Sequence, residues 1–519
     1  MTAGRLAAIG AWVSRQRHAT IPDGARRAAR VQLANMVAAA YASTRDAGVT
    51  PMLAGLPCGA GPSTVLATGR RTSPAEAAFI NAAYSMAQDF DDIIWMGHTC
   101  HSAVFAALAV AEAEQRDGEA LVAAIVVANE VAGRLGASCF LGPLNGQMWT
   151  FVHLIGAAAA TASLLGLDAT QTAHALAISL AQPPFALQPG FFTPTSKYLA
   201  ASIPTQIGVQ AAYLARAGMT GPLDVLENPR GFWSRFSFLP LPAMLDGLGE
   251  LWLIETLTIK TVPACHYFQT ACEALDVLRA RHSLRDPDAV RTITAFTTKL
   301  GSEVTRFARE EGAPHLTPVG AAFDLALTLA IALHAGGHAG EHADTAWLQS
   351  QRGALEAWYR KITVAHDPML TARVLDSARG LAAGRAALAA LTPRRLLALI
   401  RDYRASYRSE LFDLRELRRW THAIRSMWRH PPPSSTSGAL PLYFPNRIEV
   451  TFADGTRDAA QIDLPAGSLA APTFDAALRA KFLTEVSPAL GAERAEAGLA
   501  AALAADHLPI DELVAALRV

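Results

Sequence analysis

Residues Ala77 to Ser102 read AAFINAAYSMAQDFDDIIWMGHTCHS, and this stretch decides the fold of the chain. Just upstream, Ser73-Pro74-Ala75-Glu76 is a capping box with proline at the first helical position. The pattern predicts a helix that starts at Ser73 and runs through the alanine-rich segment toward Asp89. That helix ends where an unusual group of charged residues begins.

The segment from Asp89 to Ser102, DFDDIIWMGHTCHS, places three carboxylates and two histidines in this apolar neighbourhood. A helix dipole disfavours negative charge at the C-terminal end of a helix, and burial of charged groups costs solvation free energy. Stability alone would not favour aspartates here, so we interpret the segment as a chemical site. Its candidate residues are Asp89, Asp91, Asp92, His98 and His101.

His98 and His101 are three residues apart and would share one face of a helix. Carboxylates with imidazoles suit metal ligation or proton transfer, and a purely structural hydrogen-bond network at a helix junction is a third interpretation. The spacing matches no specific metal-binding motif, so we expect no metal. Imidazole, with a reference pKa of about 6.5, suits proton transfer when a neighbouring aspartate orients it.

The composition excludes several classes of protein. The chain has 519 residues, 51% of them hydrophobic and 17% charged, with 45 basic and 45 acidic residues. Without a net charge we expect no nucleic-acid partner. The longest apolar runs, such as Phe323 to Ala335, are shorter than the roughly 18–20 residues that span a bilayer, and no signal peptide is recognisable. We expect a soluble, cytoplasmic protein. The five scattered cysteines indicate neither a disulfide framework nor a zinc knuckle.

Lysine is rare in this chain. Arginine supplies nearly all of the basic residues, and lysine occurs only at Lys197, Lys260, Lys299, Lys361 and Lys481. An amine can change its protonation state when it is partly desolvated, whereas a guanidinium cannot. A lysine kept in such a chain is therefore a candidate for chemistry. Lys197 lies just before a predicted helix, and Lys260 lies where the sequence pattern changes.

That change in pattern predicts two kinds of structure. The first 250 residues or so read as successive helices separated by Gly and Pro, and from about Thr261 strand-like alternation appears. The predicted class is mainly α, with a large all-α domain and a smaller α+β domain. Helices are predicted at Ser102–Glu114, Gly118–Leu135, Phe151–Leu167, after Asp168, at Gln206–Ala217 and from Phe474 to Val519. Strands are predicted at 290–298, at 361–365 and in a hairpin around Asp454-Gly455; Pro393–His430 reads as arginine-rich helix and Pro431–Gly438 as a loop.

These segments, in this order, make the chain resemble the MmgE/PrpD family. The resemblance rests on AAFINAAYSMAQDFDD at Ala77–Asp92, GHTCHSAV at Gly97–Val104, HLIGAAAATASLLGLD at His153–Asp168, the segment Thr195–Pro222 that begins TSKYLAAS, IKTVPACH at Ile259–His266, and the late RIEVTFADG. It covers nearly the whole chain. No single segment is as specific as a phosphate-binding loop, but the ordered set is a strong signal.

The resemblance implies an architecture and a chemistry. The helical domain would comprise residues 1–260 and 471–519, with an α+β lid domain at 261–470 and the active site in the cleft between them. Such proteins dehydrate or decarboxylate small carboxylic acids without a cofactor, typically as homodimers. Their lysines and histidines hold substrate carboxylates and move protons.

Three residues fit the family pattern well, namely Asp89, Lys197 and Lys260. Two histidine positions of the family differ here. Thr99-Cys100-His101 stands where the family has H-P-S, and Gln147 stands at the second position. After Lys197, the residues Ala200 to Ile203 replace the common H-I-G-N. These departures indicate a substrate with fewer carboxylates than citrate-like acids.

The resulting hypothesis is a cofactor-independent lyase that abstracts a proton α to a carboxylate. Lys197 and Lys260 would hold the carboxylates, and His98 or His101, oriented by Asp89 or Asp91, would be the acid or base. The predicted substrate-binding residues are Thr99, Gln147, His153, Tyr198 and His266. The alternatives are an epimerase or isomerase on the same fold, a metal-dependent hydrolase that uses the DFDD segment, and a non-catalytic homologue.

Overall fold

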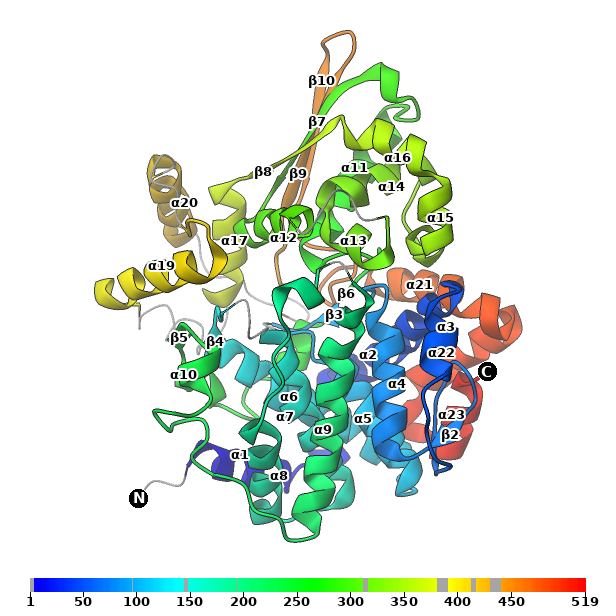
Figure 1. Cartoon of the computed structure of the whole chain (residues 1–519), viewed down its shortest axis with the longest axis vertical. Coiled ribbons are helices and arrows are strands. Elements are labelled where there is room, and N and C mark those ends of the chain that lie inside the picture. The colour runs from blue at the N-terminus through cyan, green and yellow to red at the C-terminus, as the bar shows by residue number, and fades with distance from the viewer. Residues whose placement is uncertain are drawn as a thin grey trace.

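The fold is mainly α, as the sequence predicts, with one substantial sheet at one end of the molecule (Figure 1). The structure is a computed structural model. It describes residues 4–95, 97–143, 148–192, 194–310, 316–379, 391–411, 417–429 and 440–519. Gln147 and the predicted loop Pro431–Gly438 lie outside the described residues.

The helical region is built around α7 (Met148–Leu165), the small-residue helix. It packs against α6 (Gly118–Ser138), α9 (Leu199–Arg216), α5 (Cys100–Ala113) and α8 (Ala169–Ala181). Helices can approach closely where side chains are small. A Cβ atom added at Gly208 of α9 would lie 2.6 Å from Ala157 Cβ of α7 and would overlap the Leu154 carbonyl oxygen. This glycine therefore sets the distance between α7 and α9.

Helices from the N-terminal and C-terminal parts of the chain pack together in this region, although the two termini lie on opposite sides of it (Figure 1). Helix α2 (Asp23–Ala42) packs against α21 (Phe474–Leu490) and α22 (Ala492–Leu503), and α23 (Ile510–Leu517) follows. The hydroxyl of Tyr41 in α2 donates to the carbonyl of Leu517 over 2.8 Å. Helices α1 (Arg5–Val13) and α4 (Pro74–Met86) complete the region, and α4 begins with the predicted Ser73 capping box.

The sheet has the strand order β10-β9-β7-β8. Strand β7 (Val290–Thr297) pairs in parallel with β8 (Ile362–His366) and antiparallel with β9 (Asn446–Phe452), which forms a hairpin with β10 (Arg457–Ile462). Gly455, in the predicted turn, has φ +88°, a conformation that glycine adopts without strain. Helix α11 (Gln269–Arg281) packs on β9 and β10, and α14 (Leu325–Ala335) contacts α11 and β8.

A short antiparallel pair joins the region of the DFDD segment to the chain that leads into the sheet region. Strand β3 (Asp92–Ile93) pairs with β6 (Thr258–Ile259), with Asp92 opposite Ile259. The backbone N–H of Lys260 then donates to the Asp91 carbonyl over 3.0 Å. Residues about 170 positions apart in the sequence are thus held side by side, and this pairing positions the site.

The remaining elements are short or peripheral. They are α3 (Val49–Ala54), α10 (Trp233–Phe236), α12 (Lys299–Glu310), α13 (Pro318–Phe323), α15 (Thr345–Ser350), α16 (Arg352–Tyr359), α17 (Pro368–Arg379), α19 (Pro393–Tyr407), α20 (Leu417–Arg429), β1 (Ser63–Thr64), β2 (Arg71–Thr72), β4 (Cys139–Phe140) and β5 (Leu239–Pro240), together with several 3₁₀ turns.

Two details differ from the sequence predictions. Helix α9 starts at Leu199, seven residues before the predicted start at Gln206. It therefore includes Pro204, which cannot donate a backbone hydrogen bond. The helix continues through this proline because its packing against α7 outweighs the lost hydrogen bond. Among the described residues, α6 is long and apolar enough to cross a membrane by length and composition, although no such run was expected. In α6, 94% of the apolar stretch is buried inside the protein, so the position of this helix in the core accounts for its composition.

The close approach of α7 and α9 predicts the effect of one added methyl group. We expect Gly208→Ala to lower the free energy of unfolding by about 1–3 kcal/mol, because the new Cβ has no space. The matched control is Gly353→Ala in α16, where a Cβ would meet no atom within 4 Å. Thermal unfolding of both variants measures the difference, and equal melting temperatures would contradict this account of the packing.

Candidate active site

The DFDD segment begins with an unusual backbone turn. Helix α4 ends at Met86, and Asp89 has φ +54°, in the left-handed region that only Asn, Asp and Gly visit readily. The chain then enters β3 at Asp92. After this turn, the carboxylates of Asp89 and Asp91 meet lysines, whereas that of Asp92 meets Gln32 and Asn35.

Asp89 is buried between two lysines. Lys197 Nζ donates to Oδ1 and Lys260 Nζ donates to Oδ2, both over 2.6 Å. Lys260 Nζ also donates to the Asp89 carbonyl over 2.7 Å, and Lys197 Nζ donates to the Met86 carbonyl over 3.3 Å. Burial alone would raise the pKa of Asp89, but the two ammonium groups outweigh it and lower that pKa to about 2. The carboxylate is therefore ionised at neutral pH.

Asp91 connects both predicted histidines. His98 Nδ1 lies 2.7 Å and His101 Nε2 lies 3.1 Å from Oδ2, and the Lys260 ammonium forms an ion pair with Oδ1. Burial opposes ionisation, but His98 and Lys260 hold the pKa of Asp91 well below its ordinary value. The other ring nitrogen of His101 meets Ser85 Oγ at 2.7 Å. Burial lowers the pKa of His101, so this inner imidazole favours the neutral form.

The contacts of His98 define its tautomer. Its Nδ1 also lies 2.8 Å from the carbonyl oxygen of Asp92, so both neighbours of Nδ1 are acceptors. Nδ1 must therefore carry the hydrogen, which leaves Nε2 as the basic nitrogen of the neutral ring. The Asp91 carboxylate beside Nδ1 also fixes the orientation of the ring.

Asp92 has a different role from its neighbours. Its carboxylate accepts from Gln32 Nε2 and Asn35 Nδ2, each over 3.0 Å, and points into the helical core. Burial, and secondarily the charge of Asp91, raises its pKa to about 6. Of the three aspartates, Asp89 and Asp91 thus line the cavity, whereas Asp92 has a structural role.

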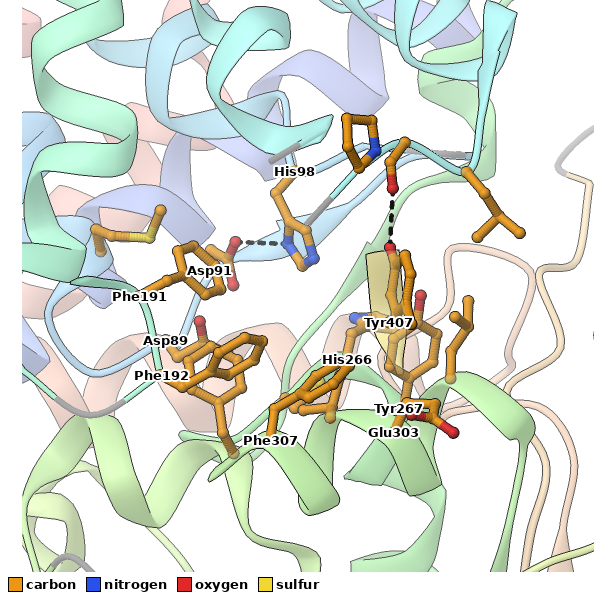
Figure 2. Close-up of a pocket in the computed structure, with 18 residues that line it drawn as sticks. Asp89, Asp91, His98, Phe191, Phe192, His266, Tyr267, Glu303, Phe307 and Tyr407 are labelled. Atoms are coloured by element: carbon orange, nitrogen blue, oxygen red, sulfur yellow. Dashed lines mark hydrogen bonds and ion pairs between the residues drawn. The ribbon is translucent and has the colours of Figure 1, made fainter. Parts of the chain in front are cut away.

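A cavity of about 110 Å³ opens beside Asp89 and Asp91 (Figure 2). By the same measure one water needs roughly 10–15 Å³, so the cavity suits a small organic molecule. Figure 2 shows His98 and Asp91 on one side and His266 with Phe307 on the other. The lining residues are Met86, Asp89, Asp91, His98, Leu141, Gly142, Pro143, Phe191, Phe192, Cys265, His266, Tyr267, Leu300, Glu303, Val304, Phe307, Phe323 and Tyr407.

His266 is the open polar group of this cavity. Its side chain is buried, and its ring centroid lies 6.4 Å from that of His98. Within the part of the chain that the structure describes, neither of its ring nitrogens has a hydrogen-bond partner. Burial, followed by the nearby His98 and Lys260, lowers its pKa well below the ordinary value. His266 is therefore a neutral imidazole that can hydrogen-bond a ligand. The sequence singled it out, and the structure brings it opposite His98.

Thr99, His153 and Tyr198, the other predicted binding residues that the structure describes, do not line the cavity. The hydroxyl of Thr99 donates to Asn129 Oδ1 over 2.5 Å, and His153 is fully buried with Nδ1 3.3 Å from Ser102 Oγ. Tyr198 is also buried and does not line the cavity. Lys197 and Lys260 likewise do not line it, and Asp89 lies between their ammonium groups and the cavity.

Sequence reasoning missed a third lysine in this cluster. Lys481 of α21 is buried, and its ammonium donates to Asn35 Oδ1 and the Phe90 carbonyl, each over 2.6 Å, and to the Lys260 carbonyl over 3.0 Å. Burial lowers its pKa to about 7. The scarcity of lysine was the available signal, but nothing local distinguishes position 481. Helix α21 thus supports the backbone of Phe90, which precedes Asp91, and that of Lys260, which pairs with Asp91.

One group of side chains has the spacing of a metal site. Among the described residues, ligand atoms of Asp91, Cys100 and His101 all lie within 4.8 Å of one another. The donor types suit zinc. However, burial raises the pKa of the Cys100 thiol well above its ordinary value, and Asp91 already contacts His98 and Lys260. A cation here would have to displace an ammonium and ionise a buried thiol, so the residues fit a metal poorly.

Comparisons with known proteins agree with the sequence resemblance. The model of the MmgE/PrpD N-terminal domain matches residues 7–240, and that of the MmgE/PrpD C-terminal domain matches residues 262–387. The chain is 27% identical over 283 residues to the cis-aconitate decarboxylase-like protein oryM of Aspergillus oryzae, covering 50% of this chain and 57% of that protein.

Two cis-aconitate decarboxylases are also similar. The Homo sapiens protein is 32% identical over 208 residues, covering 37% of this chain and 42% of its own length. That of Aspergillus terreus is 26% identical over 240 residues, covering 43% of this chain and 49% of its own length. The chain thus spans about half the length of the curated relatives it matches.

The lowered pKa of Lys481 predicts a pH dependence of stability. In the unfolded chain this amine titrates at its ordinary pKa of 10.5, whereas in the folded protein it titrates at about 7. Between these values only the unfolded state binds the proton, so raising the pH favours the folded state. We expect wild type to gain up to about 1.4 kcal/mol per pH unit relative to Lys481→Met in this window.

Thermal or denaturant unfolding between pH 7 and 10 measures this difference. Lys361→Met, which removes a lysine outside the cluster, is the matched control and should run parallel to wild type. Parallel curves for Lys481→Met and wild type would contradict the assignment of a perturbed amine at this position.

Proposed function

The chain belongs to the MmgE/PrpD family, and from that premise we propose that it is a lyase for a small carboxylic acid. The proposed reaction removes water or carbon dioxide, with the proton transfers carried by the protein's own side chains. The observation that supports it most directly is the His98–Asp91 pair, which faces His266 across the cavity. A cytoplasmic homodimer is part of the same proposal.

Such a reaction builds negative charge next to a carboxylate. Removal of the α proton creates an enediolate dianion, so a catalyst must supply positive charge and hydrogen-bond donors where that charge develops. The ammonium groups of Lys197 and Lys260 lie directly behind Asp89, which lines the cavity. A substrate carboxylate would reach these cations by sharing them with Asp89. The two lysines keep the role predicted from the sequence, with Asp89 as the group that sets their position.

The histidines would divide the remaining work. His98 has its basic Nε2 opposite the nitrogen that Asp91 holds, so we assign it the proton transfer. His266 stays neutral, which suits it to hydrogen-bond a carboxylate or a departing oxygen without adding a buried charge. His101, buried behind Asp91, would position the carboxylate of that residue.

The opposed imidazoles also favour a second candidate, an epimerase. Two rings whose centroids lie 6.4 Å apart across a cavity suit proton removal on one face and return on the other. Reaction in deuterated water separates the two activities. A lyase yields an alkene or carbon dioxide, whereas an epimerase yields substrate of unchanged composition that carries deuterium at the α carbon.

The proposal predicts the behaviour of two histidine variants. A thermal-shift screen of small carboxylic acids, followed by mass analysis of products, identifies a substrate for the full chain. With that substrate, we expect His98→Gln and His266→Gln each to lower turnover a hundredfold or more, because each removes a proton-transfer or hydrogen-bonding group at the cavity.

The control for these variants is His507→Gln, whose side chain is 75% exposed. It should retain wild-type turnover, and all three proteins should show wild-type melting temperatures within a few degrees. Near-normal turnover in both cavity variants would contradict the assignment of the site.

A further inference from the structure

We infer that the substrate is a 3-hydroxy monocarboxylic acid with an apolar group at C3, and that the reaction is its dehydration. This inference rests on the proposed lyase function and names its substrate class. It is carried by the balance of charge around Asp89 and by the aromatic rings that line much of the rest of the cavity.

The charges at the polar end are already balanced. Lys197 and Lys260 provide two positive charges, and Asp89 and Asp91 provide two negative charges. One substrate carboxylate can bind by sharing the two ammonium groups with Asp89, and it already gives this cluster a net negative charge. Additional carboxylates would remain unpaired in a buried site, which is strongly unfavourable.

The far end of the cavity offers no cation to a second carboxylate. Among the described residues, neither lysine nor arginine lines the cavity, and the charged group opposite the aspartates is Glu303. Burial opposes its ionisation, but hydrogen bonds from Lys299 and Ser409 lower the pKa of Glu303. Figure 2 shows this carboxylate on the side of the cavity away from His98.

The acceptors of Glu303 are also already in use. Oε1 accepts from Ser409 Oγ over 2.6 Å and forms an ion pair of 2.7 Å with Lys299 Nζ, and Oε2 accepts from Arg306 over 2.7 Å and 3.0 Å. A cationic substrate group would have to compete with both basic side chains. The far end therefore favours an uncharged group over either a carboxylate or an amine.

Aromatic rings cover much of the remaining wall. Phe192 contacts Phe191, Phe307 and Phe323 at centroid distances of 5.2 Å, 5.4 Å and 5.2 Å, and all four rings are buried and line the cavity. Such a surface binds hydrocarbon, because apolar groups leave water on contact with it. These rings begin beside the charged cluster, where Lys197 Nζ lies 5.2 Å from the centroid of the Phe323 ring, so they select an apolar substituent close to the bound carboxylate.

A single carboxylate favours dehydration over decarboxylation, because it remains in the product and keeps its contacts throughout. His98 takes the proton from C2, the C3–O bond breaks as the C2=C3 bond forms, and the departing hydroxide recovers a proton from the imidazolium formed in this step. The products are the 2,3-unsaturated acid and water. No oxidant or reductant is needed.

The test compares matched acids on the full-length protein. The probes are 3-hydroxybutanoate and 3-hydroxy-3-phenylpropanoate against malate, citrate and cis-aconitate, with products followed by mass analysis and kcat/KM measured for each. We expect the unsaturated monoacids to form with kcat/KM at least tenfold higher than for any polyacid. A higher kcat/KM for malate, citrate or cis-aconitate would overturn this inference and leave the proposed lyase standing. Turnover of none of the acids would overturn both.

A variant of Glu303 tests whether its negative charge disfavours a second carboxylate on the substrate. Glu303→Gln removes one negative charge without changing the size of the side chain, so the ratio of kcat/KM for malate to that for 3-hydroxybutanoate should rise tenfold or more. The matched control is Glu356→Gln in α16. Glu356 also pairs with an arginine, because its Oε2 lies 3.1 Å from the Arg360 guanidinium, but its side chain does not line the cavity. An unchanged ratio in a folded Glu303→Gln protein would contradict the assigned role of Glu303.

Discussion

The structure depends on the pairing of buried charges between Asp89, Asp91, Lys197 and Lys260. Each of these groups alone would lose several kcal/mol of solvation on burial, and only close contact with an opposite charge compensates that cost. The β3–β6 pairing brings Lys260 beside the DFDD segment, and the segment before α9 brings Lys197. Removal of any member would leave an unpaired charge in the core. The positions of the surrounding elements are therefore constrained by the site as well as by hydrophobic packing.

Much of the fold was predictable because its signals are local. The Ser73 capping box, the small-residue helix and the Asp454-Gly455 hairpin each rest on a few neighbouring residues, and the structure confirms all three. The chemical character of Asp89 to His101 was predictable for the same reason. Charged residues in an apolar, helical setting are unusual enough to be recognised without knowledge of what surrounds them.

The geometry of the site was less predictable, because its partners come from distant parts of the chain. Lys481 meets Asn35, 446 positions earlier, and its own helix carries no motif that indicates this contact. From the sequence, either Asp89 or Asp91 could orient the histidines, and the contacts identify Asp91. The aromatic wall was also missed, since phenylalanines in apolar segments look like any other core residues until their neighbours are known.

Most of the reacting groups and most of the wall residues come from different parts of the chain. Asp89, Asp91, His98 and Lys197 lie before residue 200, whereas Tyr267, Glu303, Phe307, Phe323 and Tyr407 lie after residue 260. The exceptions are Phe191 and Phe192 of the wall and the reacting groups Lys260 and His266. The first group holds the charges and the proton, which any α-proton abstraction from a carboxylic acid requires. In the proposed reaction the second group contacts the rest of the substrate. Substitutions in the second group can therefore change the accepted acid while the buried ion pairs, and with them the stability of the site, remain intact.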